Sequence, residues 1–142
     1  MFKGTISAVA VRELILFLTK SEPKDKKQNL EIAFQLLNAY LSKGLEISPV
    51  FEVFLNGFCS KSNYYRSEVK KIIFKIMDQE GDISKALELL AEDFVKNHNS
   101  SCSQHSFNLI VWLRKKGANV TPAFQIWLKV LQDSWGSGET GY

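Results

Sequence analysis

Apolar residues recur at spacings of three and four along most of the chain, which is the period of an amphipathic α-helix. Glycine, proline, asparagine and serine separate the periodic segments, as they do at helix ends. The pattern predicts seven helices, over residues 6–19, 29–42, 48–59, 64–79, 82–97, 104–116 and 121–134. With three prolines and eight glycines the chain has few of the turn residues that an all-β domain needs. The fold class predicted is therefore all-α.

Helix boundaries are predicted from capping residues. Ser48 and Thr121 are each followed by proline, the arrangement typical of a capped helix start. Residues 21–27 are expected to form a polar, basic loop because Pro23 disfavours helical geometry in the residue before it. The glycine-rich residues 136–142 are expected to form a flexible C-terminal tail, which leaves residues 1–135 as one domain.

An internal repeat is the most specific feature of the sequence. Residues 33–55 align without a gap on residues 106–128 at an offset of 73, with seven identities in 23 positions. Composition alone would give roughly one or two. The identical pairs are Phe34/Phe107, Leu36/Leu109, Lys43/Lys116, Gly44/Gly117, Pro49/Pro122, Phe51/Phe124 and Leu55/Leu128. Gly81 lies midway, where a middle hairpin would turn, so the chain is predicted to repeat an αα-hairpin of about 36 residues.

This spacing resembles the tetratricopeptide and pentatricopeptide helical-repeat families, whose units have about 34 or 35 residues. Residues 51–80, FEVFLNGFCSKSNYYRSEVKKIIFKIMDQE, are similar to the pentatricopeptide layout of two helices and a short linker. The resemblance implies a stack of consecutive αα-hairpins with a concave surface for a partner. The stack would be either a short α-solenoid or a compact helical-repeat bundle.

Composition narrows the function classes. A hydrophobic content of 45% is enough for one buried core, and a net charge of +3 permits RNA binding without requiring it. No apolar run approaches the roughly 20 residues of a membrane span, and no signal peptide is recognisable. We therefore expect an intracellular protein, nuclear or cytoplasmic, whose two cysteines, Cys59 and Cys102, are reduced thiols.

Two groups of residues have the composition of a chemical site. His98, Cys102 and His105 have the spacing of zinc ligands, but a structural site needs a fourth ligand and nothing in the sequence brings Cys59 to them, so a polar loop is favoured. The carboxylates of Glu88, Glu92 and Asp93 are interpreted as a solvated helix face. With no nucleophile or phosphate-loop motif either, the chain is predicted to have no catalytic residues, metal or cofactor.

Aromatic side chains carry the functional prediction. Trp135, at the end of the last helix, is the first candidate for an exposed anchor, and Tyr64 and Tyr65 are the second. Trp127 is apolar at a position where a base-reading repeat would carry a polar residue, which favours packing against protein. For each anchor the simpler alternative is an ordinary, partly buried aromatic. These four residues predict a non-catalytic scaffold or adaptor module that docks a helix or peptide of another protein.

Two other functions stay open. The main alternative is an RNA-binding pentatricopeptide-like module, in which clustered cations follow the phosphates and Tyr64 and Tyr65 stack on bases. Its candidate residues are Lys70, Lys71, Lys75, Arg114, Lys115 and Lys116. The other alternative is a homo-oligomer that associates through the Trp135 end.

Overall fold

The computed structural model describes residue 13 and residues 23–43 and 48–137, with the side chains of residues 23–27, 48–50 and 135–137 outside that description. These parts of the chain contain α-helices and one short 3-10 helix, with no strand. The elements are α2 (Pro23–Ser42), α3 (Ser48–Leu55), η1 (Phe58–Ser60), α4 (Asn63–Asp78), α5 (Ser84–Lys96), α6 (Ser103–Lys115) and α7 (Thr121–Ser137). The all-α prediction is confirmed for the described residues. The helix predicted over residues 6–19 lies outside them, apart from residue 13.

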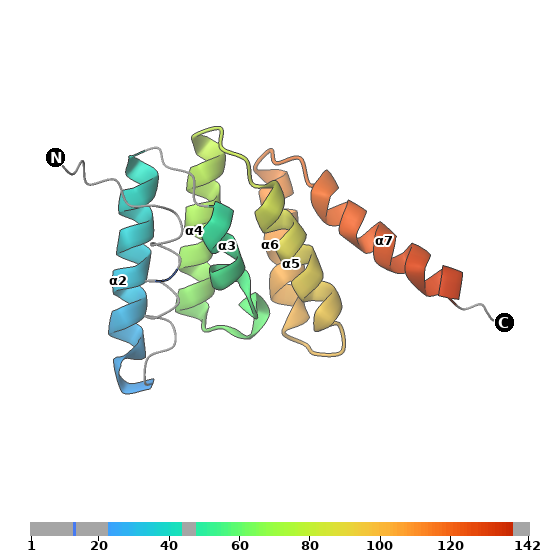
Figure 1. Ribbon diagram of the computed structural model, residues 1–142, viewed down its shortest axis with the longest axis horizontal. Coiled ribbons are helices and arrows are strands. Elements are labelled where there is room, and N and C mark those ends of the chain that lie inside the picture. The colour runs from blue at the N-terminus through green and yellow to red at the C-terminus, as the bar shows by residue number, and fades with distance from the viewer. Residues whose placement is uncertain (1–12, 14–22, 44–47, 138–142) are drawn as a thin grey trace.

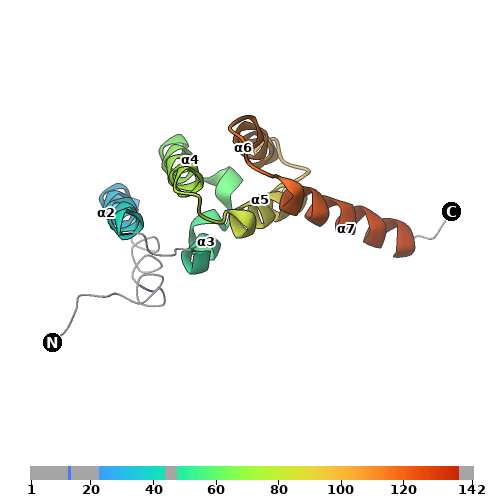
Figure 2. The same cartoon turned by 90° about the horizontal axis from the view of Figure 1, so that it is seen from above.

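The helices lie in two rows. Seen from above, α2, α4 and α6 form one row and α3, α5 and α7 form the other (Figure 2). Helix α5 is central, because it packs against α3, α6 and α7, while α2 packs against α4 and η1 contacts both α5 and α6. Helices α2 and α7 lie at opposite ends of the molecule (Figure 1).

One continuous apolar cluster runs from Leu30 on α2 to Ala123 on α7. Most apolar residues at helical spacing on α2 and on α4 are buried and contribute to it. Helix α7 contributes least among the helices, with Ala123 buried and Ile126 and Trp127 partly buried against the cluster. The core therefore thins toward the C-terminal end of the described chain.

Three helix boundaries differ from the predictions by three residues or more. Helix α2 begins at Pro23, so the loop predicted over residues 21–27 is wrong from residue 23 onward; proline is accommodated in a first helical turn because no N–H is needed there. Helix α3 ends at Leu55 instead of residue 59, because Gly57 takes a left-handed φ of 67° and leads into η1. Helix α7 continues to Ser137, so the tail predicted from residue 136 is wrong for residues 136 and 137, and residues 138–142 lie outside the described residues.

The predicted turn at Gly81 is confirmed. The N–H of Gly81 donates to the carbonyl of Ile76 (2.8 Å) and the N–H of Glu80 donates to Met77 (2.9 Å), which closes the last turn of α4. Glu80 adopts the left-handed conformation, with φ 62°. A Cβ atom on Gly81 would lie 2.6 Å from Cγ2 of Ile76, so the turn requires glycine at this close approach.

Within the described parts of the chain, no helix combines the length and apolar character needed to cross a membrane.

Candidate interaction surface

Each of the two aligned stretches contains a stacked pair of aromatic rings. Phe34 of α2 stacks on Phe54 of α3, with centroids 5.3 Å apart and planes at 29°. Phe107 of α6 stacks on Trp127 of α7, with centroids 5.8 Å apart and planes at 27°. Both partners of the second pair lie 73 residues after those of the first, so the sequence offset relates two stacked ring pairs.

The next helix covers the first ring pair. Tyr65, in the first turn of α4, lies edge-on to Phe34, with ring centroids 5.4 Å apart, and its ring centroid is 6.2 Å from that of Phe54. Its hydroxyl donates to the carbonyl oxygen of Phe54 (3.0 Å), and burial raises the pKa of this phenol above its usual value. Tyr64 contacts Phe34 at 6.0 Å. As a result Phe34 is 2% exposed.

The second ring pair has no such cover among the described residues. Phe94 of α5 contacts both rings at 5.5 Å, and the indole N–H of Trp127 donates to the carbonyl of Ala91 (3.1 Å). Phe107 nevertheless stays 40% exposed, against 2% for its counterpart Phe34.

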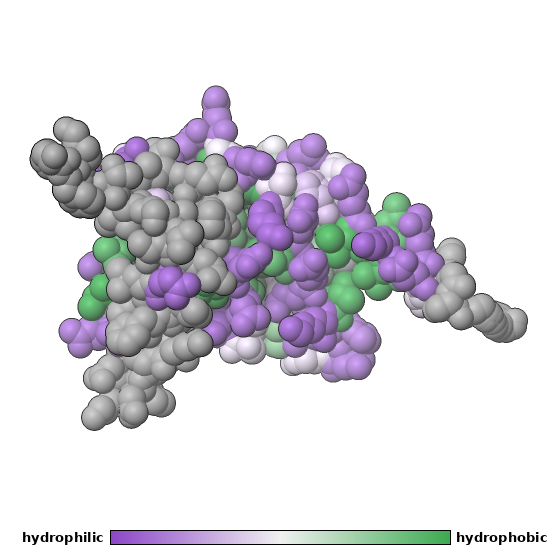
Figure 3. Space-filling view, in the orientation of Figure 1, coloured by the Kyte–Doolittle hydropathy of each residue, from purple (hydrophilic) through white to green (hydrophobic). Residues whose placement is uncertain are grey.

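Helix α7 continues the exposed region. Phe124, which contacts Trp127 at 5.6 Å, is 51% exposed, Leu128 is 55% exposed and Leu131 is 52% exposed. Spacings of four and three residues place these side chains on one face of the helix. We call Phe107, Phe124, Leu128 and Leu131 the terminal apolar face; hydrophobic side chains are visible along α7 between polar ones in Figure 3.

The second half of α7 extends past its neighbours (Figure 1). Every described side chain from Leu128 to Ser134 is exposed. An isolated helical segment of this length is marginal in water, because most helix stability in proteins comes from packing. The apolar residues of this segment are therefore suited to a contact with another molecule.

The predicted anchor residues have different surroundings. Tyr65 is 2% exposed, so its prediction as a surface anchor is wrong: the ring fills the space over Phe34 and Phe54. Tyr64 is 37% exposed and Trp127 is partly buried at the base of the terminal apolar face. Trp135 belongs to α7, but its side chain lies outside the described residues. The repeat alignment did not identify Phe124 and Leu128 as surface residues, because their counterparts Phe51 and Leu55 are buried.

The predicted cations fall into separate groups. Lys70 and Lys116 both lie over the ring of Trp112, with their Nζ atoms 4.2 Å and 5.4 Å from its centroid. Lys71 pairs instead with Glu68 at 3.2 Å, and Lys75 contacts the Asn38 side chain at 3.5 Å.

Arg114 and Lys115 are exposed in the last turn of α6. Beside Trp112, a groove of about 360 Å³ separates α4 from α6, and Arg66, Lys70 and His105 are among the residues that line it.

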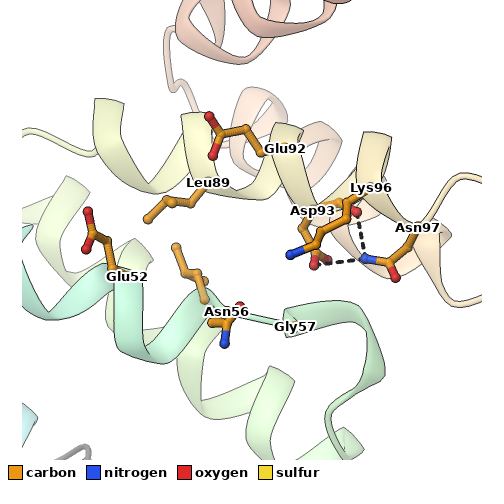
Figure 4. Close-up of a pocket in the computed structure, with 9 residues that line it drawn as sticks. Glu52, Asn56, Gly57, Leu89, Glu92, Asp93, Lys96 and Asn97 are labelled. Carbon is orange, nitrogen blue, oxygen red and sulfur yellow. Dashed lines mark hydrogen bonds between the residues drawn. The ribbon is translucent and has the colours of Figure 1, made fainter.

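A second hollow, of about 380 Å³, lies between α3 and α5 (Figure 4). Glu52 lines it from α3 and Asn56 from the turn that follows, while Glu92 and Asp93 line it from α5. Asp93 is 6% exposed, so the prediction of a solvated Asp93 is wrong, whereas Glu92 is exposed as predicted.

Hydrogen bonds occupy both carboxylate oxygens of Asp93. Oδ2 accepts from the backbone N–H of Cys59 (3.0 Å) and from the Ser106 hydroxyl, and Oδ1 accepts from the Asn97 side chain (3.2 Å). This buried charge therefore joins η1 and α6 to α5, and it is better suited to holding the fold together than to accepting a substrate proton.

His98, Cys102 and His105, which have zinc-ligand spacing, do not form a metal-ligand cluster in the described residues. In the part of the chain that the structure describes, no three His, Cys, Asp or Glu residues are grouped to hold a metal ion. Sγ of Cys102 instead lies next to Sγ of Cys59, a contact that the sequence did not reveal. Comparison of the chain with protein families, curated proteins and solved structures gives no match.

Proposed function

We propose that this protein is a non-catalytic interaction module, a short stack of αα-hairpins whose terminal apolar face docks a helix of another protein. The observation that carries the proposal is the difference between equivalent positions: Phe34 is covered by α4, while Phe107 is 40% exposed. The partner helix would take the place at α6 and α7 that α4 takes at α2 and α3.

Repetition of the hairpin is supported by matched helix ends. Helix α2 ends at Ser42 and α6 at Lys115, 73 residues later, and α3 begins at Ser48 and α7 at Thr121, again 73 residues later. The two rows of helices are also the arrangement that stacked hairpins produce (Figure 2).

The terminal apolar face suits an amphipathic helix. Phe124, Leu128 and Leu131 form a stripe on α7 that can pack against a partner with apolar residues at spacings of three and four. By analogy with Tyr65, an aromatic residue near the start of the partner helix would lie over Phe107 and Trp127.

A peptide with the sequence of α4 can serve as a probe for this contact. A labelled peptide of residues 62–78, SNYYRSEVKKIIFKIMD, contains the helix that covers the equivalent face inside the chain. We expect saturable binding of this peptide to the full chain, measured by fluorescence anisotropy. Leu128→Asp in the chain should weaken binding at least about tenfold, because a charge would be buried at the contact.

Two controls test whether peptide binding is specific to the terminal apolar face. Ile32→Asp replaces a 39% exposed residue of α2, outside the terminal apolar face, and should leave peptide affinity unchanged. A peptide carrying Tyr65→Ala should bind more weakly than the parent peptide. Absence of saturable binding, or equal binding by the Leu128→Asp and Ile32→Asp chains, would contradict the proposal. Sedimentation of the chain alone tests the homo-oligomer alternative, in which a second copy covers the same face.

RNA binding is the second candidate, favoured by the cluster around Trp112. Two cations over one indole, beside a groove lined by Arg66 and His105, combine phosphate-attracting charge with a ring that can stack on a base. This cluster lies between α4 and α6, away from the exposed stripe of α7.

A uridine oligonucleotide distinguishes the two functions. For RNA binding, affinity should fall steeply between 50 mM and 200 mM salt as counterions are released, and Lys70→Glu should weaken it. Salt-insensitive peptide binding that survives Lys70→Glu and is lost with Leu128→Asp would favour the protein-interaction module.

A further inference from the structure

Cys59 and Cys102 are the two cysteines of the chain, and the fold brings them together. Cys59 lies in η1 and Cys102 directly precedes α6, 43 residues later, yet their Sγ atoms are 2.6 Å apart. Both are free cysteines in the structure.

The surrounding structure holds both thiols in place. The carboxylate of Asp93 accepts from the backbone N–H of Cys59 and from the hydroxyl of Ser106, so one buried group fixes η1 and the first turns of α6. The left-handed Gly57 directs the chain into η1, which packs against α5 and α6. The contact therefore depends on packed elements and not on a freely moving loop.

We propose that Cys59 and Cys102 form a reversible redox modification site, at which a low-molecular-weight disulfide such as oxidised glutathione converts the two thiols into an intramolecular disulfide. In the first step the Cys102 thiolate attacks one glutathione sulfur, which breaks the glutathione S–S bond and releases one glutathione thiolate. In the second step Cys59 loses its proton to solvent and attacks Sγ of Cys102, releasing the second glutathione. The two protein thiols are oxidised and one glutathione disulfide is reduced to two thiols.

Exposure assigns the order of the steps. Cys102 is partly exposed and open to a small disulfide, whereas Cys59 is 1% exposed. Burial raises the pKa of Cys59 to about 12, and the hydrogen bond with Cys102 and the negative charge of Asp93 act in the same direction. Because the thiolate is the nucleophile, Cys102 reacts first and Cys59 resolves the mixed disulfide.

The disulfide would link the segment after α3 to the start of α6. Since η1 follows α3 and Cys102 precedes α6, the bond would close a covalent ring of chain that includes α4 and α5. Oxidation should therefore raise the midpoint temperature of unfolding, because the unfolded chain loses conformational freedom when a ring is closed.

The test uses the full chain in glutathione buffers of increasing oxidised fraction, followed by acid quenching and mass spectrometry. We expect a monomer that has lost two hydrogen atoms and a peptide linking Cys59 to Cys102. The effective concentration of the two thiols should be at least about tenfold higher in the native chain than in urea. Equal values in the two states, or linkage between two chains instead of within one, would overturn the proposal.

Single variants test the order of attack. Cys59→Ser should accumulate glutathione on Cys102, whereas Cys102→Ser should gain little glutathione at the buried Cys59. The circular dichroism of both variants should match that of the parent chain. A matching spectrum excludes unfolding as the cause of a change in thiol reactivity. Faster glutathione addition to Cys59 in Cys102→Ser than to Cys102 in Cys59→Ser would reject the assigned order.

Discussion

Asp93 is the residue whose replacement should affect stability most directly. Asp93→Ala would leave the backbone N–H of Cys59 and the hydroxyl of Ser106 without their acceptor in a buried setting. We expect a loss of about 3 kcal/mol in the free energy of unfolding, measured by urea denaturation. Glu92→Ala, on the exposed neighbouring position, is the matched control and should change stability by less than about 0.5 kcal/mol.

The burial of Asp93 could have been predicted from its position on the helix. It lies seven residues after Ala86 and three after Leu90, so it shares the buried face of α5. Sequence reasoning grouped it with Glu92 because the two are adjacent, although adjacent helical residues point in different directions. Its hydrogen-bond partners depend on how η1 and α6 pack against α5, and no local pattern reveals them.

Cys59 should make stability depend on pH in the alkaline range. Its pKa is about 12 in the folded chain and about 8.5 for an unperturbed cysteine. Between these values the unfolded chain releases this proton and the folded chain keeps it, so stability is fully present below about pH 8.5 and falls as the pH rises.

The measurement is urea unfolding of the reduced chain at several pH values between 8 and 10. The Cys59 contribution to the loss should approach about 1.4 kcal/mol per pH unit. Cys59→Ala should show a shallower decline than the parent chain, whereas parallel declines would refute the assignment to Cys59.

At the scale of single elements, the end of α4 carries local strain. Glu80 has a left-handed φ of 62°, a conformation that favours glycine. Glu80→Gly should raise the free energy of unfolding by about 1 kcal/mol in thermal or urea unfolding. Gly81→Ala should lower it, because the added Cβ would meet Ile76 at 2.6 Å. If Glu80→Gly destabilised the chain, the strain at this turn would be disproved.

Helix boundaries show which elements the sequence can predict. The start of α7 near Pro122 and the apolar stripe of α4 follow from the position of proline and from periodicity, which are local properties. The early end of α3 was not anticipated, because Phe58 and Cys59 continue the apolar spacing past Gly57. The structure buries both in η1, so apolar spacing alone did not distinguish a continuing helix from a turn that packs against α6.

At the scale of the whole molecule, Phe34 and Phe107 should contribute unequally to the free energy of unfolding, although the sequence alignment pairs them. Phe34 is 2% exposed and packed beneath α4, whereas Phe107 is 40% exposed. We expect Phe34→Ala to cost about 4 kcal/mol of stability and Phe107→Ala less than half of that, by urea denaturation. Equal costs would mean that Phe107 is covered in solution, and sedimentation would then show whether a second copy covers it.

The internal repeat anticipated the positions of these rings but not their different exposure. Identical residues at an offset of 73 predict equivalent places in two proposed hairpins. Exposure depends on what packs over each hairpin, and α4 has no counterpart over Phe107 among the described residues. The terminal apolar face and the paired cysteines both arise from contacts between distant segments, beyond the reach of local sequence patterns.

The overhang of α7 has a consequence for hydrogen exchange. Because the side chains from Leu128 to Asp133 are exposed, this segment has little buried apolar contact to hold it closed. Backbone amides beyond Val130 should therefore take up deuterium well before those of α5, which is packed on three sides. Slowed deuterium uptake in these turns would then be an early, label-free sign that a ligand has engaged the helix.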